Sequence, residues 1–181
     1  MPVGVLICGP PGTGKSSNIL KVLKNAGFEG EYIIVDPDKI EADSHADQSN
    51  KALAFLEETI DKKKDVVYVG SCSGVSKTTA FFKQMKSKKY RTVLAIAYTS
   101  LSTALKRIST RKDQPLDADI AYEVYHYFSK KAEWYMNMPY IDEIYLYNNE
   151  TEFNLLFSRK KKKVVCSDPE EEFYFDVSKY C

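Results

Sequence analysis

The sequence has few of the residues that metal centres and membrane spans require. Histidine occurs only at His45 and His126, and the cysteines do not stand in the paired spacing of a metal site. A zinc centre is therefore not indicated. The four scattered cysteines, which we expect to be reduced thiols of a cytosolic protein, are Cys8, Cys72, Cys166 and Cys181. Because no apolar run approaches about 20 residues, we expect no transmembrane helix and no membrane partner.

Charge of one sign is not in excess either. The 181 residues include 26 Lys and Arg against 25 Asp and Glu, a formal net charge of +1. This balance argues against a protein that coats nucleic acid, although it allows local basic patches. The sequence begins directly on an apolar run, which leaves no room for a signal peptide. The length suits one domain with a sizeable core, and we expect it to be cytoplasmic.

A glycine-rich loop is the most informative feature that is present. Residues 9–16, GPPGTGKS, match the phosphate-loop pattern G-x-x-x-x-G-K-[ST] at every fixed position. The apolar run 3–8 leads in as a strand, and a helical pattern over 16–26 leads out and ends at Gly27. Glycines let several backbone N–H groups point into one concavity, and the helix N-terminus adds positive potential. The loop therefore predicts binding of a nucleoside triphosphate; a Gly/Pro turn that happens to contain lysine is the alternative.

The residue types of this loop also indicate individual roles. Lys15 is expected to contact the β- and γ-phosphates, and the Ser16 hydroxyl is expected to bind Mg²⁺. ATP or GTP would then be the phosphate donor, with Mg²⁺ as its companion ion. The predicted nucleotide-binding residues are Gly9, Pro10, Pro11, Gly12, Thr13, Gly14, Lys15, Ser16 and Ser17.

Strand-like apolar runs alternate with helical patterns along the chain. The strand-like runs cover residues 3–8, 32–35, 66–69, 92–97 and 141–147. The helical patterns fall around residues 52–60, 81–85, 101–108 and 120–135. This alternation predicts a three-layer α/β fold, in which helices cover both faces of a five-stranded parallel sheet.

The pattern changes near the end of the chain. We expect a domain over residues 1–157 and an extension over 158–181 that packs on or near it and adds a short hairpin to the sheet edge. The extension contains a basic run, 159–163, read either as a solvated charged segment or as a contact for phosphates. Ligands of parallel sheets bind beyond the carboxyl ends of the strands. The segments expected to converge there are residues 9–16, 36–40, 70–74 and 98–100.

Two carboxylates follow the second predicted strand in the turn Asp36-Pro37-Asp38. A kinase that acts on an alcohol needs a carboxylate for the hydroxyl proton, and Mg²⁺ prefers oxygen ligands. Proline keeps the preceding residue extended, so Asp36 continues the strand and Asp38 reaches further forward. We therefore predict Asp38 as the base and Asp36 as the acid on the magnesium side. A turn that merely caps the next segment is the alternative.

A pair of arginines stands at the end of the helical pattern that begins near residue 99. Arg107 and Arg111 are four residues apart, so a continuous helix would place them on one face. They precede a polar, proline-containing break, after which Asp117 is placed to cap the next helix. Paired arginines beside such a loop can neutralise charge on a transferring phosphoryl group. We predict that both are catalytic; solvated surface residues are the alternative.

The order of these pieces resembles the zeta-toxin family and, more broadly, the polynucleotide-kinase-like P-loop kinases. The resemblance covers roughly residues 2–156. After the phosphate loop and the Asp36 turn it includes residues 69–71, 90–93 and 145–149. It implies a five-stranded parallel sheet, an acid after the second strand as base, and lid arginines at the transferring phosphate. By resemblance these roles fall on Asp38, Arg107 and Arg111.

The sequence departs from the family pattern on the acceptor side. The family's segment after the second strand usually carries an arginine and then His-Pro. Here Lys39 or Glu41 stands near the place of that arginine, and His45 is followed by Ala46. Many relatives have an acid before the Gly-Thr that follows the third strand, where this chain has Val69. The triphosphate site is not affected by these departures.

These features together indicate a phosphotransferase that delivers the γ-phosphate of ATP or GTP to an alcohol group. The acceptor could be a small metabolite, a nucleotide sugar, a nucleoside or a nucleic-acid end. One alternative is an NTP-hydrolysing switch or motor, but the third predicted strand does not end in aspartate, as a Walker B strand would. A catalytically weakened, nucleotide-binding regulatory protein is the other alternative.

Overall fold

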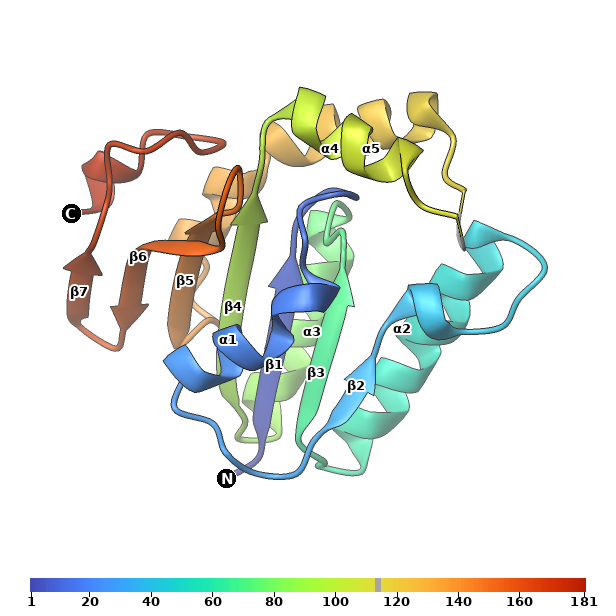
Figure 1. Ribbon diagram of the computed structural model, residues 1–181. Helices are drawn as coiled ribbons and strands as arrows, with labels where there is room; N and C mark the ends of the chain where they lie inside the picture. Colours follow the sequence, from blue (N-terminus) through green and yellow to red (C-terminus); the bar gives the residue numbers. More distant parts are fainter. Residues whose placement is uncertain (113–114) are drawn as a thin grey trace.

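The structure is a computed structural model that describes residues 1–112 and 115–181, and it places one mixed sheet between layers of helices (Figure 1). The strands are β1 (Val3–Cys8), β2 (Ile33–Val35), β3 (Val66–Gly70), β4 (Arg91–Tyr98), β5 (Glu143–Asn148), β6 (Asn154–Lys160) and β7 (Lys163–Cys166). Their order across the sheet is β2-β3-β1-β4-β5-β6-β7. Strands β1 to β5 are parallel, and β6 and β7 are antiparallel to their neighbours. This confirms the predicted α/β fold.

The sheet is wider than the five strands predicted from the sequence. The β6–β7 hairpin pairs with β5 and continues the sheet, as the left edge of Figure 1 shows. Because β6 runs from Asn154 to Lys160, the proposed boundary after Phe157 falls inside a strand.

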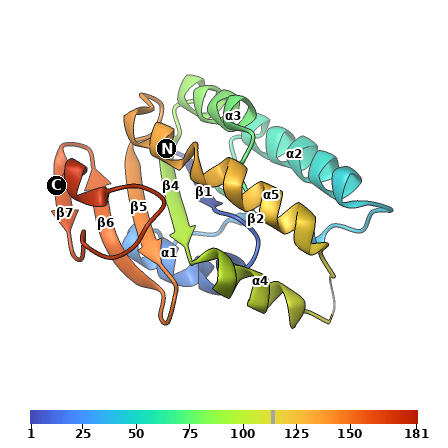
Figure 2. The same cartoon turned by 90° about the horizontal axis from the view of Figure 1, so that it is seen from above.

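Helices lie on both faces of the sheet. They are α1 (Ile19–Asn25), α2 (His45–Asp61), α3 (Val75–Ser87), α4 (Leu101–Ser109), α5 (Ala118–Ser129) and the 3-10 segments η1 (Ser16–Asn18), η2 (Pro37–Lys39), η3 (Ala132–Asn137) and η4 (Val177–Tyr180). Seen from above, α1 lies on one side of the sheet and α2 and α3 on the other (Figure 2). Helices α4 and α5 pass over the carboxyl ends of the strands. Among the described residues, no helix has both the length and the apolar character that crossing a membrane requires.

Local signals place several helix ends where the sequence predicts them. Gly27 has a φ of 63° and ends the first helical segment, and its N–H donates to the Lys24 carbonyl oxygen. Asp117 caps α5 by accepting a hydrogen bond from the Asp119 N–H at 2.7 Å. The pattern predicted over 120–135 is divided, because α5 ends at Ser129 and η3 follows. This change of direction brings Tyr135 into the core, fully buried.

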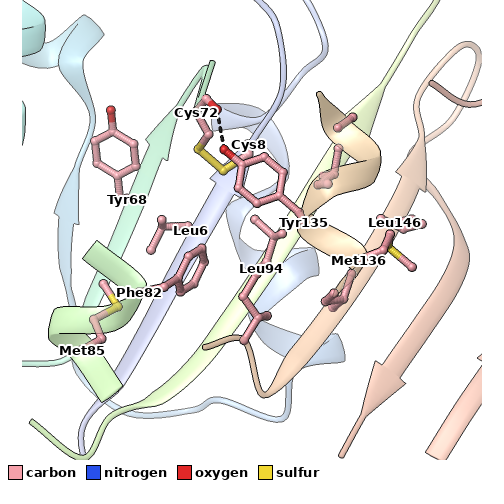
Figure 3. Close-up of a cluster of buried hydrophobic side chains, with 14 of the residues drawn as sticks. Leu6, Cys8, Tyr68, Cys72, Phe82, Met85, Leu94, Tyr135, Met136 and Leu146 are labelled. Carbon is pink, nitrogen blue, oxygen red and sulfur yellow. Dashed lines mark hydrogen bonds between the residues drawn. A yellow bond between two sulfur atoms is a disulfide. The ribbon is translucent and has the colours of Figure 1, made fainter. Parts of the chain in front are cut away.

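The larger of two cores lies between the sheet and helices α2 and α3 (Figure 3). Leu6 and Leu94 come from neighbouring strands, and Phe82 and Met85 from α3; none of the four is more than 1% exposed. Nearly continuous apolar strands are typical of sheets that are covered on both faces. The strand ends that carry the candidate site are therefore held by packing from both sides.

The expectation that all four cysteines are reduced thiols is wrong for this structure. Cys8 and Cys72 form a disulfide at a Cα–Cα distance of 5.3 Å (Figure 3), and Cys166 and Cys181 form a second one. Cys8 lies opposite Gly70 in the paired strands β1 and β3. The chain then turns at Cys72, whose φ is 51°, and its sulfur reaches Cys8. A sequence separation of 64 residues hides this proximity.

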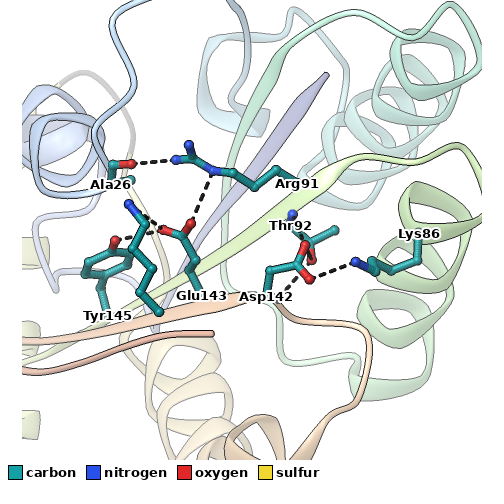
Figure 4. A network of polar contacts seen from close by, with 8 residues as sticks. Ala26, Lys86, Arg91, Thr92, Asp142, Glu143 and Tyr145 are labelled. Atoms are coloured by element: carbon teal, nitrogen blue, oxygen red, sulfur yellow. Dashed lines mark hydrogen bonds and ion pairs between the residues drawn. The ribbon is translucent and has the colours of Figure 1, made fainter. Parts of the chain in front are cut away.

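Two polar clusters fasten the amino-terminal ends of β4 and β5 (Figure 4). Arg91 Nε lies 3.3 Å from Glu143 Oε1, and the Tyr145 hydroxyl donates to the same carboxylate. In the other cluster Asp142 accepts from Lys86 at 2.7 Å and from the Thr92 N–H at 2.9 Å. Partial burial alone would raise the pKa of Asp142, but the hydrogen bonds from these donors have the larger total effect and lower it. Both clusters lie at the amino-terminal ends of the strands, whereas the phosphate loop lies at the carboxyl-terminal ends.

The C-terminal extension packs over the carboxyl end of β4. The Tyr174 hydroxyl donates to the Ala97 carbonyl oxygen at 2.9 Å, and Asn148 Nδ2 donates to the Glu172 carbonyl oxygen at 2.9 Å. The rings of Tyr98 and Tyr174 meet edge to face, with centroids 5.0 Å apart. Together with the Cys166–Cys181 disulfide, these contacts attach the extension to the sheet.

Candidate active site

The phosphate loop adopts the backbone that its glycines allow. Gly12 and Gly14 have φ values of 83° and 80°, a region that L side chains rarely occupy. A Cβ atom at Gly12 would also lie 2.6 Å from the Ala104 carbonyl oxygen, so helix α4 approaches the loop closely. The buried Thr13 hydroxyl donates to the Pro10 carbonyl oxygen at 2.8 Å and closes the turn. Contacts within the protein therefore hold the loop in this conformation.

Lys15 points back over this loop. Its ammonium donates to the Pro10 carbonyl oxygen at 2.8 Å. Burial lowers the pKa of Lys15 to about 8; the charge of Asp38 acts in the opposite direction, and that of Arg111 lowers the pKa further. A buried ammonium held among backbone groups is suited to an anionic ligand, which would compensate for its lost hydration.

The two carboxylates of the Asp36 turn have different surroundings. Asp36 is 5% exposed; its Oδ1 accepts from the Asp38 N–H at 3.1 Å, and its Oδ2 accepts from the Ser16 hydroxyl at 3.2 Å. It thus caps the 3-10 turn and touches the phosphate loop at once. Asp38 is exposed, and its Oδ2 lies 3.6 Å from Arg111 Nη1. The sequence-based order, with Asp36 inside and Asp38 further out, agrees with this geometry.

Arg107 and Arg111 do not lie together. Helix α4 ends at Ser109, so Arg111 stands beyond the helix and the four-residue spacing no longer places the pair on one face. Arg111 lines the cavity opposite Asp38. Arg107 instead donates to the carbonyl oxygens of Gly12 at 3.3 Å and Asn149 at 2.8 Å, on the outer side of the loop. It is not among the described residues that line the cavity.

The turn between β5 and β6 supports the phosphate loop, which the sequence did not indicate. Asn149 Nδ2 donates to the Thr13 carbonyl oxygen at 2.9 Å. The neighbouring Glu150 carboxylate accepts hydrogen bonds from four groups around the start of α4: the Thr99 hydroxyl, the Ser100 N–H and hydroxyl, and the Thr103 hydroxyl. Burial acts to raise the pKa of Glu150, but these donors prevail and lower it to about 2. Only the Asn-Asn pair at the end of a predicted strand hinted at this turn.

A cavity of about 260 Å³ lies between the phosphate loop, η2, the first turns of α2, the end of β3 and α5. Its lining includes Lys15, Asp36, Asp38 and Arg111, which the sequence analysis selected. Three of the four segments predicted to converge on one rim line it, through residues 14–17, 36–38 and 70–71. In the fourth segment, residues 98–100, Thr99 and Ser100 donate to Glu150 instead.

One wall of the cavity was not predicted. It is formed by His45, Ser49, Tyr68, Leu116, Ile120 and Val124. Tyr68 was read only as part of an apolar strand, and the α5 residues as a helix pattern. The positions of Tyr68 near a strand end and of Leu116 after the proline-containing break were the available signals, and neither is specific.

The sequence of the chain matches the model of a known protein family. The model of the Zeta toxin family matches residues 1–130. The chain belongs to this family. The resemblance that the order of motifs suggests is thereby confirmed, whereas no curated protein sequence matches the chain significantly.

Solved structures share the fold of this zeta-toxin family member. A chain in the crystal structure of AvrRxo1-ORF1:AvrRxo1-ORF2 with ATP superimposes with a TM-score of 0.73 at 14% identity, covering 94% of this chain and 62% of that one. A chain of the PezAT toxin-antitoxin system of Streptococcus pneumoniae gives 0.63 at 17% identity, covering 93% and 75%. Shikimate kinase from Acinetobacter baumannii, in complex with shikimate, gives 0.51 at 18% identity, covering 76% and 80%. These likenesses establish a P-loop kinase fold, and the chain spans less than two thirds of the AvrRxo1 complex chain.

Proposed function

We propose that this protein is a kinase that transfers the γ-phosphate of ATP, or of GTP, to a hydroxyl group of an acceptor. The observation that carries the proposal is the meeting of Lys15, Asp38 and Arg111 in one cavity beside a formed phosphate loop. A carboxylate and a guanidinium facing a phosphate site are the groups that phosphoryl transfer to an alcohol requires. The ATP in the AvrRxo1 structure supports a triphosphate as donor.

Each residue has a distinct part in the proposed reaction. The loop N–H groups and Lys15 bind the phosphates of the donor. The oxygen of the acceptor hydroxyl forms a bond to the γ-phosphorus, and Asp38 accepts the proton that this hydroxyl loses. The bond to the bridging oxygen breaks, and the nucleoside diphosphate leaves. Arg111 neutralises charge on the transferring phosphoryl group, whereas Arg107 holds the loop from outside.

The Ser16 hydroxyl and Asp36 fit a magnesium ion. Their oxygen atoms lie 3.2 Å apart at the start of the first helical segment, and the Asp36 carboxylate is buried beside the loop. Mg²⁺ prefers such oxygen donors, one or two per site, with phosphates completing the shell. We propose that these two residues hold the ion, which when bound would neutralise charge on the β- and γ-phosphates.

Radiolabelled γ-phosphate transfer tests this proposal. We expect Lys15→Ala to lose ATP binding and transfer, and Asp38→Asn to lose transfer while it keeps ATP binding. Asp43→Asn is a matched control, because Asp43 is exposed in the same loop and is not among the described residues that line the cavity. Transfer at the wild-type rate by Asp38→Asn would exclude Asp38 as the base. ATP hydrolysis with no transfer to any acceptor would favour a hydrolysing switch.

A further inference from the structure

The charged residues of the cavity are all on its phosphate side. Lys15, Asp36 and Asp38 belong to the loop and the acidic turn, and Arg111 faces Asp38. The opposite wall, formed from α2, the end of β3 and α5, has no Asp, Glu, Lys or Arg among its described residues. The cavity's Lys15 and Arg111, which would be the cations for a phosphorylated acceptor, are the ones that the donor phosphates already need.

The Tyr68 hydroxyl is the polar end of a largely buried side chain on this wall. Tyr68 is 9% exposed and lines the cavity, and none of the side-chain hydrogen bonds between the described residues involves its hydroxyl. In Figure 3 its ring stands apart from the other labelled side chains, with the oxygen at the outer end. Burial and the charge of Asp36 raise the pKa of Tyr68 to about 12, so the hydroxyl keeps its proton at neutral pH. A hydroxyl that opens on a cavity can exchange hydrogen bonds with a ligand bound there.

Gly70 fixes the position of this hydroxyl. A Cβ atom at Gly70 would lie 2.5 Å from Tyr68 Oη and 2.6 Å from Cε1. The tyrosine ring therefore occupies the space that a side chain would fill, at the point where β3 ends. Because Gly70 has no positive φ, alanine is compatible with its backbone and would act by displacing the ring.

Apolar side chains of helix α5 and of the segment before it line the cavity. Ile120 and Val124 are four residues apart on α5, and Leu116 precedes the helix by the same interval from Ile120. The spacing places Ile120 and Val124 on one side of the helix, and Leu116 lines the cavity from the segment before it. Ile120 is 48% exposed, so it is left open to the cavity rather than packed in the core. Such a surface suits the apolar or aromatic part of a small ligand.

The lysines at the end of α3 and in the β6–β7 hairpin lie away from the site. Lys86 and Lys88 at the end of α3 pair with Asp142 and Asp61, and Lys160 in the β6–β7 hairpin lies 3.9 Å from Glu143. These partners are at the amino-terminal edge of the sheet, whereas the cavity is at the carboxyl-terminal edge. These lysines therefore do not extend the cavity.

We infer that the acceptor is a neutral molecule that combines hydroxyl groups with an apolar or aromatic part, as nucleosides and glycosides do, and that the Tyr68 hydroxyl binds one of its polar groups. This inference rests on the proposed kinase function. The apolar residues of α5 contact the apolar part, and an acceptor hydroxyl reaches Asp38. Tyr68 is a specificity-determining residue in this arrangement, and it does not contribute to binding of the donor.

Steady-state transfer from Mg-ATP to matched acceptors tests the inference with the full chain. The panel contains adenosine and cytidine with their 5′-monophosphates, and 4-nitrophenyl glucoside with glucose and glucose 6-phosphate. We expect the KM of a neutral nucleoside or of the glucoside to be at least about tenfold below that of the phosphorylated counterpart. The reason is that the phosphate of the acceptor would enter the cavity without a cation to pair with it. Glucose distinguishes hydroxyl groups alone from hydroxyl groups with an apolar part, and the two arms distinguish nucleosides from glycosides.

Variants of the wall give a second readout. Tyr68→Phe and Gly70→Ala should each raise the acceptor KM about three- to tenfold, as loss of one hydrogen bond does, with the KM for ATP unchanged. Ile120→Asn should weaken the preferred acceptor more than it weakens glucose. Tyr90→Phe is the matched control, because the buried Tyr90 hydroxyl donates to the Lys64 carbonyl oxygen at the other end of the sheet. It should leave both KM values unchanged.

The outcomes separate this inference from the proposed function. Preference for the phosphorylated members, or a wild-type acceptor KM for Tyr68→Phe, would overturn the inference while the observed transfer supports a kinase. If Tyr68→Phe and Tyr90→Phe changed the acceptor KM and the ATP KM by the same factors, the effect would be merely structural, and this result would also overturn the inference. Absence of transfer to every member would overturn both.

Discussion

The side-chain amide of Asn149 donates a 2.9 Å hydrogen bond to the carbonyl oxygen of Thr13. It thereby joins the turn after β5 to the middle of the phosphate loop, across 136 positions of sequence. Arg107 adds donors to Gly12 on one side and to Asn149 and Glu150 on the other. The loop, helix α4 and the β5–β6 turn are therefore one connected unit. Changes at the outer side of the loop should affect donor binding without any contact to the reacting atoms.

Arg107→Ala should weaken this unit. The guanidinium donates to three carbonyl oxygens, and its loss leaves them without these donors. We expect the free energy of unfolding to fall by about 1–3 kcal/mol, with weaker ATP binding as the loop loses its support. Urea denaturation and ATP titration measure the two effects. Lys106→Ala, an exposed lysine of the same helical turn, is the control and should change neither.

Arg111→Ala should behave differently, because Arg111 faces the cavity and Asp38 rather than the loop backbone. We expect kcat to fall about 100-fold or more, as when one charge-stabilising group is removed from a transition state. Stability should change little, since the side chain is partly exposed and its ion pair is at the surface. Transfer kinetics alongside ATP affinity check this. A lower ATP affinity with unchanged kcat would place Arg111 at donor binding instead.

Glu150 gives the fold a dependence on acid. Its folded pKa of about 2 lies below the ordinary value of 4.5, so the carboxylate stabilises the protein fully above pH 4.5. This contribution is lost as pH falls from 4.5 towards 2. Glu150→Gln should therefore cost about 2 kcal/mol at pH 7, as hydrogen bonds to a charged group do, and progressively less in acid. Denaturation curves of both proteins at pH 7, 5, 4 and 3 test this; a constant difference would contradict it.

The parts of the site that the sequence predicted are those determined by local chemistry. The phosphate-loop pattern specifies its own backbone, because its glycines and the helix that follows are contiguous. Asp36 and Asp38 were ordered correctly because Pro37 restricts the residue before it. Apolar runs without alternation identified the five parallel strands, since both faces of the sheet are covered.

The parts that were missed depend on contacts between distant segments. Cys8 and Cys72 meet only because β1 and β3 are neighbours in the sheet. Arg111 separates from Arg107 because α4 ends two residues before it, and a helical pattern does not specify that end to within a turn. Tyr68 has the same sequence signature as a core residue. The space that its ring occupies beside the cavity depends on the absence of a side chain at Gly70.

The two disulfides predict a specific pattern of thiol reactivity. With both formed, the unreduced, unfolded protein should take up no iodoacetamide, and the reduced protein should take up four equivalents, measured by intact mass. Replacing Cys166 and Cys181 together by serine should lower the free energy of unfolding by about 2–4 kcal/mol, because the bond restricts the unfolded chain by closing a loop. Alkylation of all four cysteines without reductant would show that the expectation of free thiols was correct.

Donor binding should depend on pH through Lys15. Burial sets the pKa of its ammonium at about 8 in the free protein, below the ordinary value of 10.5. A bound triphosphate stabilises the charged form and raises that pKa, so proton uptake accompanies binding near pH 8. ATP affinity should be constant below about pH 7 and fall up to tenfold for each pH unit above 8. Lys24 is an exposed lysine of α1, and the control variant Lys24→Ala should show the same pH profile. Calorimetry at pH 8 in two buffers of different ionisation enthalpy measures the proton uptake directly, and equal heats in both buffers would contradict a role for the Lys15 ammonium at the phosphates.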